Sequence, residues 1–360
     1  MGPQTIVVFG TGAFAARIVF DIAATAAQPV RVVIAGRNRE RLAWLATASA
    51  ARAVIFARPA AFVAQTCDLL DADQVEAVLA TERPSVVVQA ASVQTSSVIA
   101  ATGDAWSRLV AEGGLSATAV FQAVLSTRVA VAMARLGTEA RLVNCSFPDV
   151  VNPMIVAAGH RVACGIGNVA ILANVFAAQS GVIEPGRLKV LAHYQTIAPW
   201  RRPPEARSGP APRVFIDDAE VADVFARFRA ARLTPEPAIE ISGASGVPLI
   251  LALASGARWR GHAPGPNGLP GGYPVRVDAG AVTLDLPAPV SREEAVAWNA
   301  RFEEENGLTV DRNGRAHYTG KLRALLARHA PSLADGFAIA DLDEVHQAMD
   351  ALRTRLQARS

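Results

Sequence analysis

Residues 5–23 read TIVVFGTGAFAARIVFDIA, an apolar run that enters a glycine turn and continues as an amphipathic pattern. The turn has the spacing Gly-x-Gly-x-x-Ala. In such a strand–turn–helix the first glycine permits the tight bend and the second lets backbone approach a pyrophosphate, which the free N–H groups of the helix start attract. A purely structural turn is the alternative interpretation. The predicted cofactor contacts are Gly10, Thr11, Gly12, Ala13 and Phe14.

Apolar runs typical of buried strands alternate with helical patterns as far as about residue 150. Continuous Val and Ile runs separated by helices indicate a parallel sheet covered on both faces. We therefore predict an α/β fold with a Rossmann doubly wound parallel sheet in residues 1–150. The expected strands cover residues 5–10, 30–36, 53–57, 85–91 and 141–146, and the expected helices lie near 13–27, 38–50, 71–81 and 115–136.

The pattern changes after residue 150. We expect an α+β substrate domain over residues 151–317 and a helical tail over 318–360 packed on the rest. Ser291 is expected to cap a helix, because Glu294 follows three residues later as in a capping box. The other expected elements are a helix to about 180, a strand over 187–200, helices near 217–232, 246–256 and 291–307, and a hairpin before residue 287.

The end of the second expected strand bears on which nucleotide binds. An NAD site usually places an acidic residue there, whereas this chain reads AGRNR at residues 35–39. A guanidinium suits the 2′-phosphate of NADP through charge-assisted, bidentate contacts. We therefore predict NADP(H) as the cofactor, held by Arg37, Asn38 and Arg41. Loose arginines on a solvated helix start are the alternative.

Two further strand ends complete the predicted cofactor site. Asp68 could accept a hydrogen bond from the adenine amino group, or it could cap a helix. Ala90, Ala91 and Ser92 follow the fourth strand, where small residues leave room for the nicotinamide ribose. Both placements follow from the rule that ligands bind beyond the carboxyl ends of parallel strands.

The order of these pieces resembles the lactate/malate dehydrogenase superfamily over roughly residues 5–310. The resemblance lies in VVVQAASVQT (86–95), RLVNCSFPDVVNP (141–153), RLKVLAHYQTIAPW (187–200) and the segment 271–307. It implies an LDH-type C-terminal domain and places the catalytic histidine at His193. Phe147 stands where the family has an asparagine, and Asn144 is the candidate replacement. GRNRERL (36–42), by contrast, is similar to NADP-preferring short-chain and saccharopine-type reductases.

The departures from that family bear on the reaction. The helix after the Asn-Pro turn reads CGIGNVAIL (164–172), without the family's aspartate and carboxylate-binding arginine. We therefore expect an NADP(H)-dependent oxidoreductase that reduces a C=O or C=N bond of a small metabolite, and not a standard lactate or malate dehydrogenase. His193 would lack its usual carboxylate partner. A histidine suits proton donation near neutral pH, and His262, which opens the loop GHAPGPNGLPGGYP, is the second candidate.

Two other functions stay open. The superfamily includes NAD- and metal-dependent family 4 glycosidases, and Cys164 with His193 resemble their metal-binding pair. A non-catalytic NADPH sensor is the other. Beyond that resemblance the sequence predicts no metal site. The arginines of the loop 199–213 could gather an anionic substrate or cover the cofactor phosphates, or they could be solvated.

Bulk composition limits the partners and the compartment. Of 360 residues, 51% are apolar and 19% charged, and the net charge of +3 forms no basic stripe, which argues against nucleic acid as a partner. Three widely spaced cysteines and a start without a basic leader predict a cytoplasmic protein. Charged or polar residues interrupt the most apolar windows, so we expect no membrane span. The apolar tail helices and the habits of the superfamily predict a homodimer or homotetramer.

Overall fold

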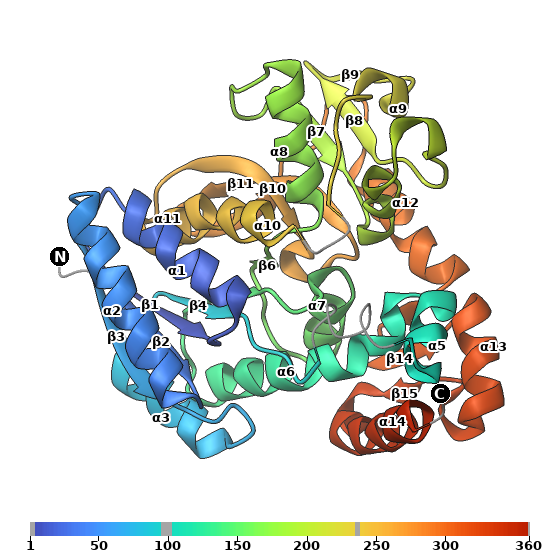
Figure 1. The fold of residues 1–360 in the computed structure, drawn as a ribbon, viewed down its shortest axis with the longest axis horizontal. Helices are drawn as coiled ribbons and strands as arrows, with labels where there is room; N and C mark the ends of the chain where they lie inside the picture. Colours follow the sequence, from blue (N-terminus) through green and yellow to red (C-terminus); the bar gives the residue numbers. More distant parts are fainter. Residues whose placement is uncertain (1–3, 95–102, 235–237, 359–360) are drawn as a thin grey trace.

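Six parallel strands form the central sheet of the computed structural model, which describes residues 4–94, 103–234 and 238–358 (Figure 1). Their spatial order is β3-β2-β1-β4-β5-β6, and β1 pairs with both β2 and β4. The strand order therefore reverses at β1, where ligands bind beyond the carboxyl ends of such sheets. The strands are β1 (Gln4–Phe9), β2 (Val30–Gly36), β3 (Ala60–Thr66), β4 (Val86–Gln89), β5 (Arg141–Asn144) and β6 (Cys164–Gly165).

Alternate side chains of the sheet enter two different cores, as the period of a strand requires. Val7 and Phe9 pack with the helices α3 (Ala72–Glu82), α6 (Ala119–Arg135) and α14 (Leu342–Gln357). Ile6 and Val8 pack on the other side with α1 (Ala13–Thr25), α2 (Arg39–Ile55) and α11 (Val247–Ser255). The predicted α/β fold with a doubly wound parallel sheet is confirmed.

Elements from the second half of the chain complete the molecule. A third core joins α8 (Val169–Ser180) to the antiparallel sheet of β7 (Leu188–Leu191), β8 (Arg213–Ile216) and β9 (Ala219–Glu220). Two other antiparallel sheets follow the orders β10-β11-β12 and β13-β14-β15. Their strands are β10 (Trp259–Pro264), β11 (Gly272–Asp278), β12 (Ala281–Leu284), β13 (Leu308–Val310), β14 (Arg315–Tyr318) and β15 (Phe337–Ala338). The remaining α-helices are α5 (Ala105–Gly113), α7 (Pro148–Ala157), α9 (Val224–Arg227), α10 (Ile239–Ser245), α12 (Arg292–Glu305) and α13 (Gly320–His329).

Several expected elements were wrong. Residues 53–57 are not a strand, because α2 continues to Ile55 and the third strand is β3. The expected strand over 187–200 stops at Leu191 and gives way to 3-10 turns, including η2 (Tyr194–Thr196). The expected helix near 217–232 begins as a β-hairpin, since Asp217 and Asp218 have left-handed φ angles of 50° and 63°.

Other details of the second half agree with expectation or refine it. Ser291 caps α12, where its Oγ accepts a hydrogen bond from Glu294 N at 3.1 Å. The boundary expected near residue 150 falls inside α7, and β6 beyond it completes the parallel sheet.

One described segment, Leu115–Arg135, is long and apolar enough to cross a membrane by length and composition. However, 78% of its apolar window is buried inside the fold. It joins η1 (Leu115–Thr118) to α6, which packs against α3, α7 and α14. Core packing therefore accounts for its apolar composition.

Candidate functional site

The glycine turn after β1 leaves an open helix start. Gly10 has φ +130°, and a Cβ there would come within 3.0 Å of the Ala90 backbone, so only glycine fits between β1 and β4. Gly12 forms the N-cap of α1 without a side-chain cap, and no described atom lies within 4 Å of the position of its missing Cβ. Ala15 is buried at the contact with the sheet. The positive end of α1 therefore faces open space, as an anion site requires.

The predicted phosphate contacts after β2 differ in how free they are. The side chain of Arg37 is 71% exposed and its Nη1 lies 3.9 Å from Asp68 Oδ2, a weak surface pair. Arg41 Nε instead donates to the carbonyl of Thr11 at 3.3 Å, which ties α2 to the glycine turn. Asn38 caps α2 by accepting from Arg41 N at 2.9 Å. Arg37 is thus the group free to meet a phosphate, while Asn38 and Arg41 shape the turn.

Asp68 follows β3 and is engaged by its own loop. Its Oδ1 accepts from Leu70 N at 3.0 Å, and its backbone N–H donates to Gln74 Oε1 at 3.0 Å. The N-cap of the following helix α3 is Asp71. The alternative reading of Asp68 as a helix cap is therefore wrong by three residues, and an adenine contact stays a prediction.

Ala90, Ala91 and Ser92 are half-buried at the carboxyl end of β4. The Gln89 amide holds this segment, because it donates to Ala91 O at 2.8 Å and accepts from Ala91 N at 2.6 Å. Ser146 Oγ, which follows β5, donates to the same carbonyl at 2.8 Å. The segment therefore lies at the carboxyl ends of β4 and β5, and its contact with the nicotinamide ribose stays a prediction.

Asn144 ends β5 and has no free hydrogen-bonding group. Its Oδ1 accepts from Ser126 Oγ at 3.0 Å and Ser146 N at 2.9 Å. Its Nδ2 donates to Ser146 O at 3.0 Å and to Asn152 Oδ1 at 2.8 Å. The fully buried side chain therefore holds the turn between β5 and α7, and its expected catalytic role stays a prediction.

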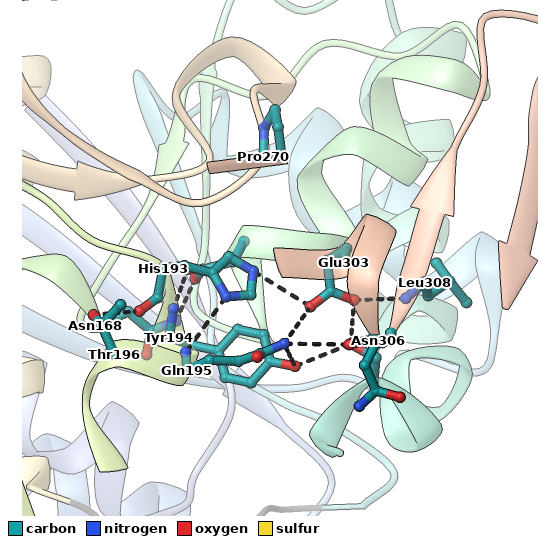
Figure 2. Close-up of polar contacts among 12 residues, drawn as sticks. Asn168, His193, Tyr194, Gln195, Thr196, Pro270, Glu303, Asn306 and Leu308 are labelled. Atoms are coloured by element: carbon teal, nitrogen blue, oxygen red, sulfur yellow. Dashed lines mark hydrogen bonds and ion pairs between the residues drawn. The ribbon is translucent and has the colours of Figure 1, made fainter. Parts of the chain in front are cut away.

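His193 lies just beyond β7 in a polar cluster (Figure 2). Its side chain has no exposed surface. Its ring stacks on Phe302 of α12 with 4.8 Å between centroids and an interplanar angle of 2°. Nδ1 accepts a long hydrogen bond of 3.4 Å from Gln195 N. Nε2 lies 3.3 Å from Glu303 Oε1, but that contact is not aligned as a hydrogen bond, so Nε2 is a buried atom without a partner among the described residues. Other buried side chains, such as Trp106 and Tyr318, also lack a hydrogen-bond partner, so it is the pairing with a buried carboxylate that distinguishes His193.

Glu303 supplies one carboxylate of the cluster from α12. It is 3% exposed, and its Oε2 accepts from Ser116 Oγ and from Leu308 N, both at 2.6 Å. Its Oε1 faces His193 and accepts from Gln195 Nε2 at 3.4 Å. Glu303 therefore joins α12 to η1, to β13 and to the turn that carries His193.

Asp149 supplies a second carboxylate, from the first turn of α7. Its Oδ1 accepts from Tyr194 N at 3.1 Å, and its Oδ2 accepts from the side-chain amide of Asn168. Burial raises the pKa of Asp149, and the nearby His193 opposes that shift. The expectation that His193 lacks a carboxylate partner is therefore wrong: Asp149 and Glu303 take that place from two elements where none was expected.

Tyr194 connects this cluster with the end of β5. Its ring lies 4.8 Å from that of Phe147, which begins α7, and 4.4 Å from that of His193. Its hydroxyl lies 3.2 Å from Ser116 Oγ. Burial, and then the charge of Glu303, raise the pKa of Tyr194 well above its usual value, so it stays protonated.

His262 occupies a different environment from the one expected. It lies in β10 and not in a loop, and its Nε2 accepts from Val190 N at 3.0 Å. Burial lowers the pKa of His262 to about 3, so it is neutral at physiological pH. With Nε2 engaged by a neighbouring strand, His262 is corrected from a candidate proton donor to a link between β10 and β7.

The arginines of the loop 199–213 bind their own chain. Arg207 lies over the Trp200 ring at 4.7 Å and donates to the carbonyl of Arg229 at 3.1 Å. Arg213 pairs with Glu220 at 2.7 Å and with Glu294 at 2.6 Å. These two side chains are therefore committed to local structure.

The metal alternative finds little support. Cys164 is buried in β6, and burial raises the pKa of its thiol to about 12, whereas a metal binds the thiolate. No group of three or more His, Cys, Asp or Glu side chains suited to a metal occurs among residues 4–94, 103–234 and 238–358.

Solved dehydrogenase structures are similar to this chain. Malate dehydrogenase from Cryptosporidium parvum matches with a TM-score of 0.54 at 13% identity, over 83% of this chain and 96% of that one. Malate dehydrogenase from Picrophilus torridus, in its apo form, matches with 0.55 at 12% identity, over 83% and 94%. Lactate dehydrogenase from Cryptosporidium parvum, complexed with lactic acid and β-nicotinamide adenine dinucleotide, matches with 0.50 at 14% identity, over 97% and 99%.

These likenesses confirm that the chain has a lactate/malate dehydrogenase-like fold. No protein-family model and no curated protein matches the sequence. Saccharopine dehydrogenase from Saccharomyces cerevisiae aligns with only 39% of the chain at a TM-score of 0.24, which is too low to indicate a shared fold. The reductase-like reading of residues 36–42 therefore stays a prediction.

Proposed function

We propose that this chain is an NADP(H)-dependent oxidoreductase that reduces a C=O or C=N bond of a small metabolite. One observation carries the proposal. The open start of α1 at Gly12 and the exposed Arg37 follow the neighbouring strands β1 and β2 at their carboxyl ends, and the stretch AGRNR that holds Arg37 contains no carboxylate. The weak contact of Arg37 with Asp68 at 3.9 Å leaves the guanidinium able to turn to a phosphate. An anion-binding helix start suits a pyrophosphate, and a free guanidinium suits a 2′-phosphate. The dehydrogenase-like fold supports a nicotinamide cofactor.

The bound nicotinamide would supply the hydride, and the protein would supply a proton and a closed site. Reduction adds a hydride to the substrate carbon and a proton to its oxygen or nitrogen. His193 is the proposed proton donor through Nε2, its unpartnered nitrogen. Glu303 at 3.3 Å compensates the charge of a protonated imidazole. Since His193 has no exposed surface, the side chains that pack against its ring, Tyr194 and Phe302 among them, have to rearrange before a substrate reaches it.

The substrate is proposed to differ from a 2-hydroxy acid. Helix α8 reads VAILANVFAAQS and carries no charged side chain. An arginine in the corresponding helix of the resembled family anchors the substrate carboxylate. Without a bidentate partner there, a carboxylate adds little binding energy, which favours a neutral carbonyl or imine compound.

Full burial of His193 favours a second candidate function, an NADPH-binding protein without turnover. In that case NADPH would bind and no substrate would be consumed. Cofactor consumption across a broad set of carbonyl and imine compounds separates the two.

We also propose a cytoplasmic homodimer or homotetramer without nucleic-acid or membrane partners. The described cysteines are free thiols, which supports a reducing compartment. Exposed apolar side chains along α2, among them Trp44 and Ile55, support self-association. Light scattering after size-exclusion chromatography gives the mass in solution.

The proposal is tested by titrating NADPH and NADH in parallel against the wild type and Arg37→Gln. Loss of a charge-assisted phosphate contact of about 1.5–3 kcal/mol weakens NADPH binding by roughly 10- to 100-fold and leaves NADH binding unchanged. Arg58→Gln is the matched control, because the exposed Arg58 lies just before β3, at the amino ends of the strands, whereas Arg37 follows the carboxyl end of β2. Equal losses for both nucleotides, or none, would remove the NADP assignment.

A further inference from the structure

A cavity of about 270 Å³ lies at the amino ends of β1 and β2, and the glycine turn follows the carboxyl end of β1. It is bounded by the end of α1, the start of β2, α11 and the start of β10, with α1 and α11 on one side of the sheet in Figure 1. Gln4 and Val30, the first residues of β1 and β2, line it. The proposed cofactor site lies beyond the last residues of the same strands, so the proposed reaction does not use this cavity.

Most of the cavity wall is apolar. Val30, Leu251 and Ala252 contribute to it, and the Trp259 indole forms one side. The indole lies across Gly261, since a Cβ on that glycine would come within 2.3 Å of Trp259 Cζ2. The cavity opens to the surface, since Pro29, Pro248 and Ala257 of its lining are exposed, and its apolar wall gives water few hydrogen-bond partners. At about 30 Å³ per water-sized group, the space holds on the order of nine heavy atoms.

The rim adds a cation to this wall. Arg258 is the only charged side chain among the described residues that line the cavity. Its Nε lies 3.4 Å from Asp278 Oδ1, and the two side chains are 87% and 64% exposed. Such an exposed pair contributes little, so the guanidinium is free to turn to another anion. The amides of Gln4 and Gln28 also line the cavity.

We propose that this cavity binds a medium-chain alkyl carboxylate of about eight carbons, with its chain against the Trp259 wall and its carboxylate at Arg258. The wall and the volume select the apolar chain, and the guanidinium selects the acid over an alcohol. A single fatty acid suits this cavity better than a membrane surface does, because one cation alone, Arg258, lies among the described residues that line it.

Isothermal titration calorimetry of the full chain with hexanoate, octanoate and 1-octanol tests the proposal. Each buried methylene contributes about 0.8 kcal/mol, so octanoate should bind roughly 15-fold more tightly than hexanoate. Arg258→Gln should weaken octanoate binding by about two- to fivefold and leave 1-octanol binding unchanged, since an exposed charge pair contributes at most about 1 kcal/mol. Arg276→Gln, on the exposed side of β11, is the charge-matched control.

Two variants fill the space. Leu251→Trp places a larger side chain in the cavity, and Ala257→Trp does the same from an exposed position, where the substitution should not disturb folding. Both should abolish octanoate binding while NADPH binding is retained, which keeps this test separate from the proposed reaction. Octanoate binding that is absent in the wild type, independent of chain length, or unchanged in both filled variants would overturn the proposal. Occupation of the cavity by a second copy of the chain would appear as the first of these results.

Discussion

Replacing Glu303 by alanine tests the architecture of the His193 cluster. The Glu303 carboxylate is 3% exposed, and its Oε2 accepts from Ser116 Oγ and Leu308 N, both at 2.6 Å. Alanine removes both hydrogen bonds: Leu308 N is left without a partner, and Ser116 Oγ keeps only the Tyr194 hydroxyl at 3.2 Å. A hydrogen bond to a charged group contributes about 1.5–3 kcal/mol, so Glu303→Ala should lower the free energy of unfolding by about 3–6 kcal/mol. Water entering the vacated space would bring the loss toward the lower value.

Urea unfolding followed by circular dichroism measures this loss, with an unchanged m-value showing that the same surface unfolds. Glu304→Ala is the matched control, because Glu304 is the exposed neighbour on the same helix and should change stability by no more than about 0.5 kcal/mol. A double-mutant cycle with Ser116→Ala isolates the shared hydrogen bond, with an expected coupling energy of about 1–3 kcal/mol.

A loss below about 1 kcal/mol for Glu303→Ala, or no coupling between Glu303 and Ser116, would refute the prediction. Either result would mean that the carboxylate contributes little to the buried cluster. The proposed compensation of a protonated His193 by Glu303 would then be lost.

Two other predictions concern pH and the glycine turn. Burial lowers the pKa of His262 to about 3, so below its ordinary value of about 6.5 the unfolded chain binds the extra proton and stability falls as the pH falls. Between pH 7 and 5 the free energy of unfolding of the wild type should fall by up to about 2 kcal/mol more than that of His262→Gln, as measured by urea unfolding. Equal decreases in the two proteins would contradict this prediction. Gly12→Ala should keep its Tm but bind NADPH at least about tenfold more weakly, because the methyl enters open space at the helix start. Gly10→Ala, at φ +130° and 3.0 Å from Ala90, should instead lose about 1–3 kcal/mol of stability. Normal NADPH binding by Gly12→Ala would move the pyrophosphate away from this turn.

The fold was predictable where local and global signals agree. The first strand, the turn and α1 lie in one contiguous stretch, and each residue type has a local reason for its position. The cap at Ser291 is another such case, because a capping box needs only four consecutive residues. These features depend on residues close together in the sequence and little on tertiary packing, so the sequence predicts them.

The third strand was missed because apolar composition does not distinguish a strand from a helix end. Val54 and Ile55 are 82% and 73% exposed at the end of α2, so their apolarity reflects no burial in the sheet. The true strand β3 lies at the edge of the sheet and reads AAFVAQT, with little of the Val and Ile enrichment that marks a central strand. The apolar run 53–57 is too short to distinguish a strand from a helix by its composition, and neither its length nor the residues that flank it were taken into account. The prediction therefore placed a strand where α2 ends.

The partners of His193 were missed for a different reason. Glu303 stands in EEEN and reads as part of a solvated helix face. Yet Ala295, Asn299, Phe302 and Glu303 follow each other at helical spacing and are all buried, so one face of α12 points inward and includes this glutamate. That spacing was a usable signal. Asp149 offered none, since its burial depends on how the turn after β7 packs against α7.

The two halves of the proposed site therefore have different origins, and this decides how a loss of activity should be read. The cofactor half is local, so Gly12 and Arg37 can be changed without disturbing the core. The proton-donor half is assembled from distant segments around His193, where the buried Glu303 carboxylate joins α12 to Ser116 and Leu308. Any substitution there alters stability before it alters chemistry. An inactive His193 variant consequently implicates the imidazole in proton transfer only if it still binds NADPH and unfolds at the concentration of urea that unfolds the wild type.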